Sequence, residues 1–120
     1  MRSERAPRIA AAGAVLSVGL LVAAGVAPAA AAKTIDVTSP ASDPLSYRGI
    51  PATLKPGKYT FRYTNRTGMS HDLKVGSKKT PLFSAGTRSF TVTLRKGTVK
   101  YLCTVPGHAA AGMSGTILVR

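Results

Sequence analysis

The chain has 120 residues and is strongly basic, with 17 lysines and arginines against 4 acids and a formal net charge of +13. A single cysteine excludes an internal disulfide, so this thiol pairs between chains, stays reactive or binds a ligand. The charge favours anionic partners. The sequence carries no recognisable nucleic-acid-binding motif, and we expect no nucleic acid among those partners.

Residues 1–32 are typical of a secretory signal peptide. A start with three arginines is followed by an uncharged stretch, 9–32, that is rich in Ala, Val, Leu and Gly and ends in three alanines. This pattern predicts export and cleavage after Ala32; the alternative is an uncleaved membrane anchor, for which the stretch is long enough. We therefore expect one mature domain, residues 33–120, in a periplasmic, cell-surface or extracellular location, with no membrane span after cleavage.

From residue 33 onward, apolar and polar residues alternate over short stretches that are separated by Gly, Pro, Ser and Asn. This alternation is typical of β-strands. In chain order the predicted strands are 34–37, a short edge segment at 50–54, 58–65, 71–75, 87–94, 98–103 and 116–120. The segments 38–48, rich in Ser and Pro, and 76–86 are predicted to be connections. About seven strands without a convincing helix predict an all-β fold, an antiparallel sandwich or barrel.

Side chains alternate between the two faces of a strand, and this alternation places two candidate metal ligands at strand ends, facing the core. His71 lies on the apolar face of its predicted strand, and Asp72 lies on the opposite face. Cys103 shares the inward face of its own strand with Val99 and Tyr101. An inward histidine and an inward thiol without partners would be poor choices for stability alone, because burying an unpaired polar group costs free energy.

A short segment near the C-terminus gathers soft ligands. Cys103, His108 and Met113 are separated by gaps of four residues, and a Pro-Gly pair predicts a tight turn that brings His108 back beside Cys103. Taken singly, a cysteine or a methionine is more often a buried apolar side chain than a ligand. Together, sulfur and imidazole favour copper, and two histidines, one cysteine and a weak methionine define a blue-copper site. His71 would supply the second histidine.

This segment resembles the cupredoxins, the plastocyanin/azurin group of type 1 blue-copper proteins. The likeness rests on the run Cys-Thr-Val-Pro-Gly-His, on Gly-Met-x-Gly-Thr after it, and on the upstream pattern Asn65-x₅-His71-Asp72-Leu73. The resemblance implies that residues 33–120 form a cupredoxin-like Greek-key β-sandwich or barrel and bind one type 1 copper ion.

The resemblance also implies a role for each ligand. His71, Cys103 and His108 would form a trigonal plane around copper, and Met113 would be the weak axial ligand. His108 would be the partly exposed ligand through which electrons enter and leave. The chain differs from the family at Asp72, which stands where an asparagine often ties the two ligand segments together. An ionised aspartate accepts hydrogen bonds but cannot donate them.

The function that the resemblance implies is that of a small exported one-electron carrier, cycling between Cu(I) and Cu(II), and not an enzyme. The related copper enzymes need further histidines for additional copper centres, and this chain has two. The alternatives are a copper storage or delivery protein that uses the same site and a metal-free immunoglobulin-like adhesion domain. We expect a monomer, and protein redox partners with acidic docking surfaces.

Overall fold

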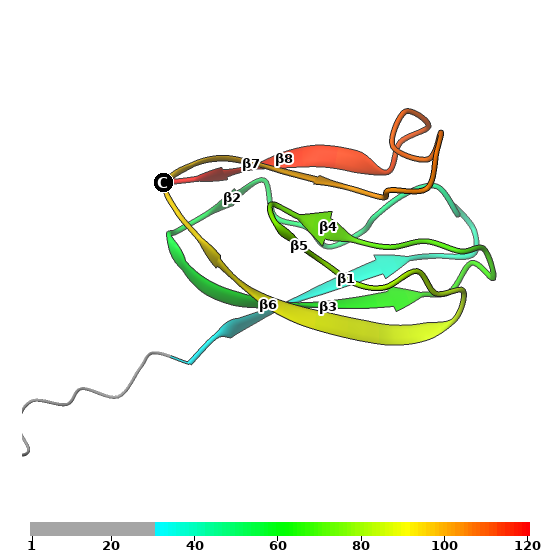
Figure 1. Cartoon of the computed structure of the whole chain (residues 1–120), viewed down its shortest axis with the longest axis horizontal. Coiled ribbons are helices and arrows are strands. Elements are labelled where there is room, and N and C mark those ends of the chain that lie inside the picture. Colours follow the sequence, from blue (N-terminus) through cyan, green and yellow to red (C-terminus); the bar gives the residue numbers. More distant parts are fainter. Residues whose placement is uncertain (1–30) are drawn as a thin grey trace, which may run out of the picture.

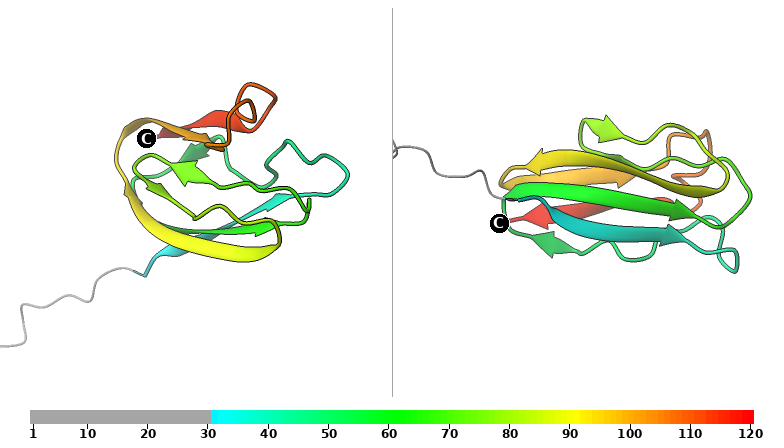
Figure 2. Two further views of the ribbon diagram at one scale, coloured as in Figure 1. Left: turned by 45° about the vertical axis from the view of Figure 1, so that its right-hand side comes forward. Right: turned by 90° about the horizontal axis from the view of Figure 1, so that it is seen from below.

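The computed structural model describes residues 31–120 as two β-sheets that face each other (Figure 1). The three-stranded sheet contains, in order, β1 (Lys33–Ser39), β3 (Gly57–Asn65) and β6 (Gly86–Leu94). The five-stranded sheet contains, in order, β2 (Thr53–Leu54), β8 (Ser114–Val119), β7 (Gly97–Leu102), β4 (Lys74–Val75) and β5 (Lys78–Lys79). The left view of Figure 2 shows the two layers one above the other, and the right view shows them overlapping from below. The predicted all-β sandwich is confirmed.

The predicted signal peptide lies outside the described residues, except for its last two positions. Within residues 31–120, no helix is long and apolar enough to cross a membrane.

Strand β3 follows from the alternation that predicts it. Tyr59, Phe61 and Tyr63 are buried, and the residues between them face outward. β3 pairs with β1 on one side and antiparallel with β6 on the other, so that Phe61 lies opposite Phe90 and the two rings stack at 5.6 Å. This register sets the inward face of the three-stranded sheet, because side chains on a strand alternate between its two faces.

The predicted antiparallel arrangement is wrong for two strand pairs. β1 runs parallel to β3, and β2 runs parallel to β8. A parallel pair needs a crossover connection. Residues 40–56 supply it here, because the chain leaves β1, contributes β2 to the other sheet and returns to begin β3.

The predicted strand 71–75 is shorter in the structure, where only Lys74–Val75 is a strand. β4 pairs with β7 as far as Leu102, and beyond that point the backbone N–H of Thr104 donates to the Asp72 carboxylate instead of to a strand. The pairing of β4 with β7 therefore does not extend to His71, which forms an isolated bridge with Phe83. The segment predicted as a loop, 76–86, contains the additional short strand β5.

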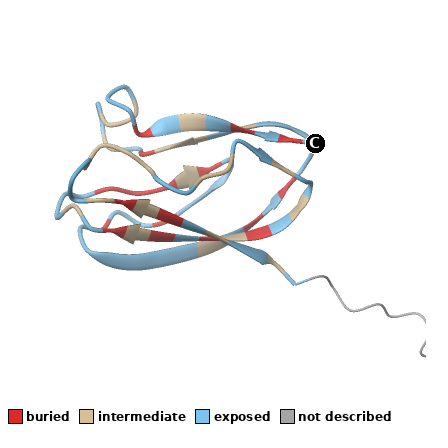
Figure 3. Ribbon diagram, turned by 180° about the vertical axis from the view of Figure 1, so that it is seen from behind, coloured by how far each residue is buried: buried red, intermediate tan, exposed pale blue. Residues whose placement is uncertain are grey.

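The hydrophobic core lies between the sheets, where buried positions alternate with exposed ones along the strands (Figure 3). Its members are Val37, Tyr59, Phe61, Tyr63, Leu73, Val75, Phe83, Val92, Leu94, Ile117 and Val119. Cys103 and Met113 are also buried, at the end of the sandwich where β3 ends and β7 passes into the loop before β8 (Figure 1). The candidate ligands therefore lie at the edge of the core.

Candidate metal centre

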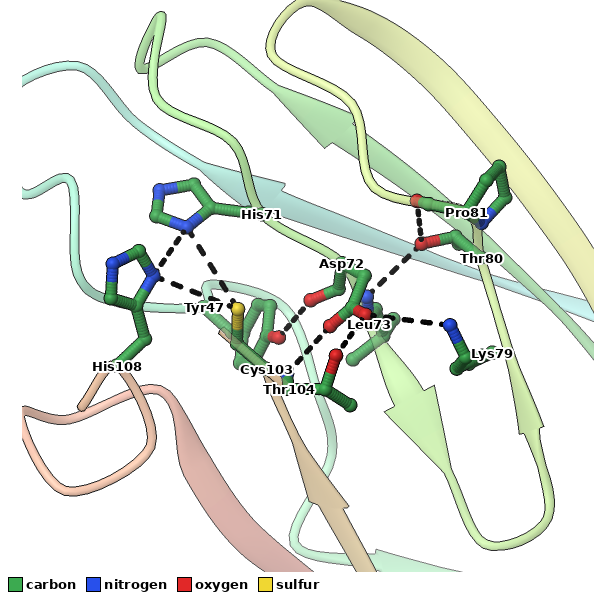
Figure 4. A network of polar contacts seen from close by, with 10 residues as sticks. All are labelled: Tyr47, His71, Asp72, Leu73, Lys79, Thr80, Pro81, Cys103, Thr104 and His108. Carbon is green, nitrogen blue, oxygen red and sulfur yellow. Dashed lines mark hydrogen bonds and ion pairs between the residues drawn. The ribbon is translucent and has the colours of Figure 1, made fainter. Parts of the chain in front are cut away.

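Three of the predicted ligands point toward one another in Figure 4. The Nδ1 atoms of His71 and His108 are 3.1 Å apart. The Sγ atom of Cys103 lies 4.0 Å from the Nδ1 of His71 and 3.7 Å from the Nδ1 of His108. His71 and Cys103 are buried, whereas His108 is half-buried. The structure thus brings together two imidazoles and a thiol from segments that lie 32 residues apart in the chain.

The triangle of ligand atoms fits one metal ion. A nitrogen about 2.0 Å and a thiolate sulfur about 2.3 Å from a shared ion lie roughly 3 to 4 Å from each other. One ligand atom from each of the three residues lies within 4.8 Å of those of the other two. Two imidazole nitrogens that face each other at this separation repel unless a proton or a cation lies between them. The arrangement therefore suits a cation better than an apolar core.

The loop after β7 is held closed by its own backbone. The N–H of Cys103 donates to the carbonyl of Met113 at 3.0 Å, and the N–H of Met113 donates to the carbonyl of His108 at 3.1 Å. The predicted Pro-Gly turn is present, with Gly107 at a φ of +85°, where a side chain would be strained. Met113 is fully buried at the base of this loop. Ligand positions in this half of the site are therefore fixed by the chain itself.

Asn65, at the end of β3, positions the other half of the site. Its buried side chain donates to the carbonyls of Met69 at 2.8 Å and Phe83 at 2.7 Å. Its Oδ1 accepts from the backbone N–H and the hydroxyl of Thr67 at 3.0 and 2.8 Å. The same Phe83 exchanges two backbone hydrogen bonds with His71, both 3.1 Å long. Asn65 therefore folds the segment that delivers His71.

Asp72 joins the two halves of the site. Its side chain is fully buried, and its Oδ1 and Oδ2 accept from the backbone N–H of Thr104 at 2.7 Å and from the Thr104 hydroxyl at 2.5 Å. Lys79 approaches Oδ2 to 3.8 Å. The sequence places Asp72 on the face opposite His71 but does not show that Thr104 and Lys79 cover that face. Acceptor capacity alone is sufficient for this link.

Burial controls the protonation of the two buried ligand candidates. It raises the pKa of the Cys103 thiol, although backbone hydrogen bonds from Asp72 and Val105 to the sulfur act in the opposite direction. Burial also lowers the pKa of His71, and the neighbouring His108 lowers it further, while the Pro44 carbonyl acts against both. The Nε2 atom of His71 nevertheless makes no hydrogen bond of normal geometry. Neutral imidazole is the form that binds metals, so His71 is ready to bind one.

Tyr47 is the residue that the sequence does not predict to lie at the site. It comes from the connection 40–52, which lacks alternation, yet its hydroxyl donates to the backbone carbonyl of Asp72. Its ring makes edge-on contacts with Tyr63 at 5.4 Å and with Tyr101 at 5.9 Å. Burial, and then the nearby Cys103, raise the pKa of Tyr47, so the hydroxyl remains a donor. Tyr47 thus closes the side of the site that faces the core.

The lowered pKa of His71 predicts that the copper-free protein becomes less stable in mild acid. The unfolded chain takes up a proton near pH 6.5, the ordinary pKa of histidine, whereas folded His71 resists protonation until a lower pH. Stability should therefore fall as the pH drops below that value, because the unfolded state binds more protons. Urea unfolding between pH 8 and pH 5 measures this effect. The loss of stability with falling pH should be smaller in His71→Gln than in the wild type. An equal loss in both proteins would show that His71 is not its cause.

The fold and the donor set together define a copper protein of the cupredoxin class. Residues 34–120 match the family of copper binding proteins described as the plastocyanin/azurin family. The chain belongs to this family, and copper is its cofactor. No curated protein sequence matches the chain.

Solved structures with the same fold include copper proteins. Auracyanin A, described as a blue copper protein from Chloroflexus aurantiacus, is 21% identical with a TM-score of 0.61, and the match covers 75% of this chain and 100% of that one. An auracyanin from Roseiflexus castenholzii is 20% identical with a TM-score of 0.60, covering 76% and 99%. A copper-containing nitrite reductase from Thermus scotoductus is 11% identical with a TM-score of 0.58, covering 73% and 31%. At these identities the likeness supports the fold alone.

Proposed function

We propose that this protein is a type 1 copper protein that carries single electrons, with His71, Cys103, His108 and Met113 as the ligands of one copper ion. The observation that carries the proposal is the triangle of two Nδ1 atoms and one Sγ atom at the end of an all-β core. Two imidazoles, a thiolate and a thioether are the ligands of blue-copper sites. Bound copper would supply the one-electron change between Cu(II) and Cu(I).

The role of the protein is to keep these ligands in place while the charge changes. Hydrogen bonds of Asn65 fix the segment that carries His71, and those of Asp72 tie that segment to the one that carries Cys103. A site that is fixed in advance moves little during electron transfer, which favours speed, and partners outside the ligand set contribute to this orientation.

His108 is the ligand candidate that reaches the surface. It is half-buried, and the residues that follow it, Ala109 to Ala111, are small. A partner can therefore approach the imidazole edge closely. We place electron entry and exit at this edge.

Acidic redox partners suit the charge of residues 33–120. Each of the three acids in this range already contacts a basic side chain: Asp43 contacts Arg48, Asp36 contacts Arg62 and Asp72 contacts Lys79. The other lysines and arginines leave a net positive surface, which attracts acidic partners. The leader-like residues 1–32 support export and cleavage, so we place the mature protein, as a monomer, outside the cytoplasm.

Retention of copper during redox cycling tests whether the protein carries electrons or delivers metal. The copper-loaded protein is reduced with ascorbate and reoxidised with ferricyanide through ten cycles, with a Cu(I) chelator present. We expect the visible band to return fully and the metal content to stay constant, because buried ligands hold the ion in both states. Transfer of copper to the chelator on reduction would favour storage or delivery instead.

A further inference from the structure

Asp72 is a buried carboxylate located between two ligand segments. It directly follows His71, and it accepts two hydrogen bonds from Thr104, which directly follows Cys103. Its exposed fraction is 0%. Burying a charge is costly unless hydrogen bonds and a counter-charge offset the loss of water. A neutral side chain of the same shape could make the same link, so the charge itself calls for an explanation.

The counter-charge of Asp72 is only partly inside the protein. Among residues 31–120, its ion-pair partner is Lys79, at 3.8 Å, and the Lys79 side chain is 50% exposed whereas that of Asp72 is 0% exposed. Water screens a charge at the surface far more than a charge in the interior. A net negative potential from Asp72 therefore remains at the ligand cluster.

We propose that the Asp72 carboxylate lowers the reduction potential of the copper site, and that Lys79 partly opposes this effect. The inference rests on the proposed function, because it concerns the same copper ion. A fixed negative charge stabilises the more positive oxidation state, Cu(II), relative to Cu(I). Reduction of the site then becomes less favourable, and the protein becomes a better electron donor. Asp72 thus acts on the copper site through its charge and not as a ligand.

Substitution of Asp72 by asparagine tests the charge without removing the link. The amide oxygen of Asp72→Asn can still accept from the Thr104 N–H. A redox titration of the copper-loaded protein at fixed pH and salt should show a higher reduction potential. The expected shift corresponds to about a tenfold change in the equilibrium constant, about 59 mV for one electron. A purely structural link would leave the potential unchanged.

Two lysine variants provide the matched comparison. Lys79→Gln removes the counter-charge and should lower the potential, by less than the Asp72→Asn shift, because the Lys79 side chain is half exposed. Lys78→Gln removes the same charge from the preceding exposed residue of β5, which does not pair with Asp72, and should leave the potential unchanged. Since Lys79→Gln alters a surface side chain, it tests the proposal even if Asp72→Asn does not fold.

Stability of the copper-free proteins separates charge from structure. The urea concentration at the midpoint of unfolding should be close to that of the wild type for Asp72→Asn. It should be clearly lower for Asp72→Ala, because the Thr104 N–H loses its acceptor. A visible band with unchanged potentials in Asp72→Asn and Lys79→Gln would overturn this inference alone. A wild-type protein without the band would overturn the proposed function and this inference together.

Discussion

Replacing Cys103 with alanine is expected to abolish the intense visible absorption of the copper-loaded protein. The thiolate–Cu(II) bond is the source of that colour in a blue-copper site, and Cys103 is the only cysteine of the chain. Copper should also bind much more weakly, because two imidazoles and a thioether remain. The measurement is a visible spectrum after addition of one equivalent of Cu(II). The free energy of unfolding of the copper-free protein should change by only about 1 kcal/mol, as for a typical single substitution.

Met69→Leu is the matched control for this variant, because it removes another sulfur from the same end of the molecule. Met69 is 40% exposed, and its backbone carbonyl, rather than its sulfur, contacts Asn65. We expect this variant to keep the full visible band. If the band survived in Cys103→Ala, the ligand assignment would be wrong.

Replacing Asn65 with alanine is expected to lower the free energy of unfolding of the copper-free protein by about 2–4 kcal/mol. Asn65 is 2% exposed, and its side chain takes part in hydrogen bonds with Met69, Phe83 and Thr67. Each such bond contributes about 1 kcal/mol net, and a buried group left unpaired costs more. Copper affinity should fall as well, because the segment that carries His71 loses its anchor. Urea denaturation and a copper competition assay measure the two effects.

Thr60→Ala is the control on the same strand. Its hydroxyl shares a hydrogen bond with Thr91 on the exposed face of the three-stranded sheet. Exposed substitutions of this kind change stability by within about 0.5 kcal/mol. If Asn65→Ala and Thr60→Ala had the same effect, Asn65 would not organise the site.

The sequence predicts the parts of this protein that depend on local pattern. Tyr59, Phe61 and Tyr63 alternate with polar residues, and they form the buried face of β3. The turn between Cys103 and His108 follows from a Pro-Gly pair and is present in the structure. Features that depend only on residue type and on short spacings along the chain can be predicted without a structure.

The parts that sequence does not predict depend on contacts between distant segments. Asp72 and Thr104 are 32 residues apart, and Tyr47 and Asp72 are 25 residues apart. An alternating pattern assigns Asp72 to an outward face, but it does not reveal that another segment covers that face. Tyr47 comes from a connection without periodicity, so no local signal marks it. Such contacts arise only when distant segments meet in the fold, as when β4 pairs with β7.

The visible spectrum during copper titration tests the central claim most directly. Addition of Cu(II) to the copper-free wild-type protein should produce an intense visible band that stops growing at one copper per chain. The band should vanish on reduction and return on reoxidation. Colourless binding of Cu(II), or no binding, would contradict the assignment of His71, Cys103, His108 and Met113 as a type 1 copper site.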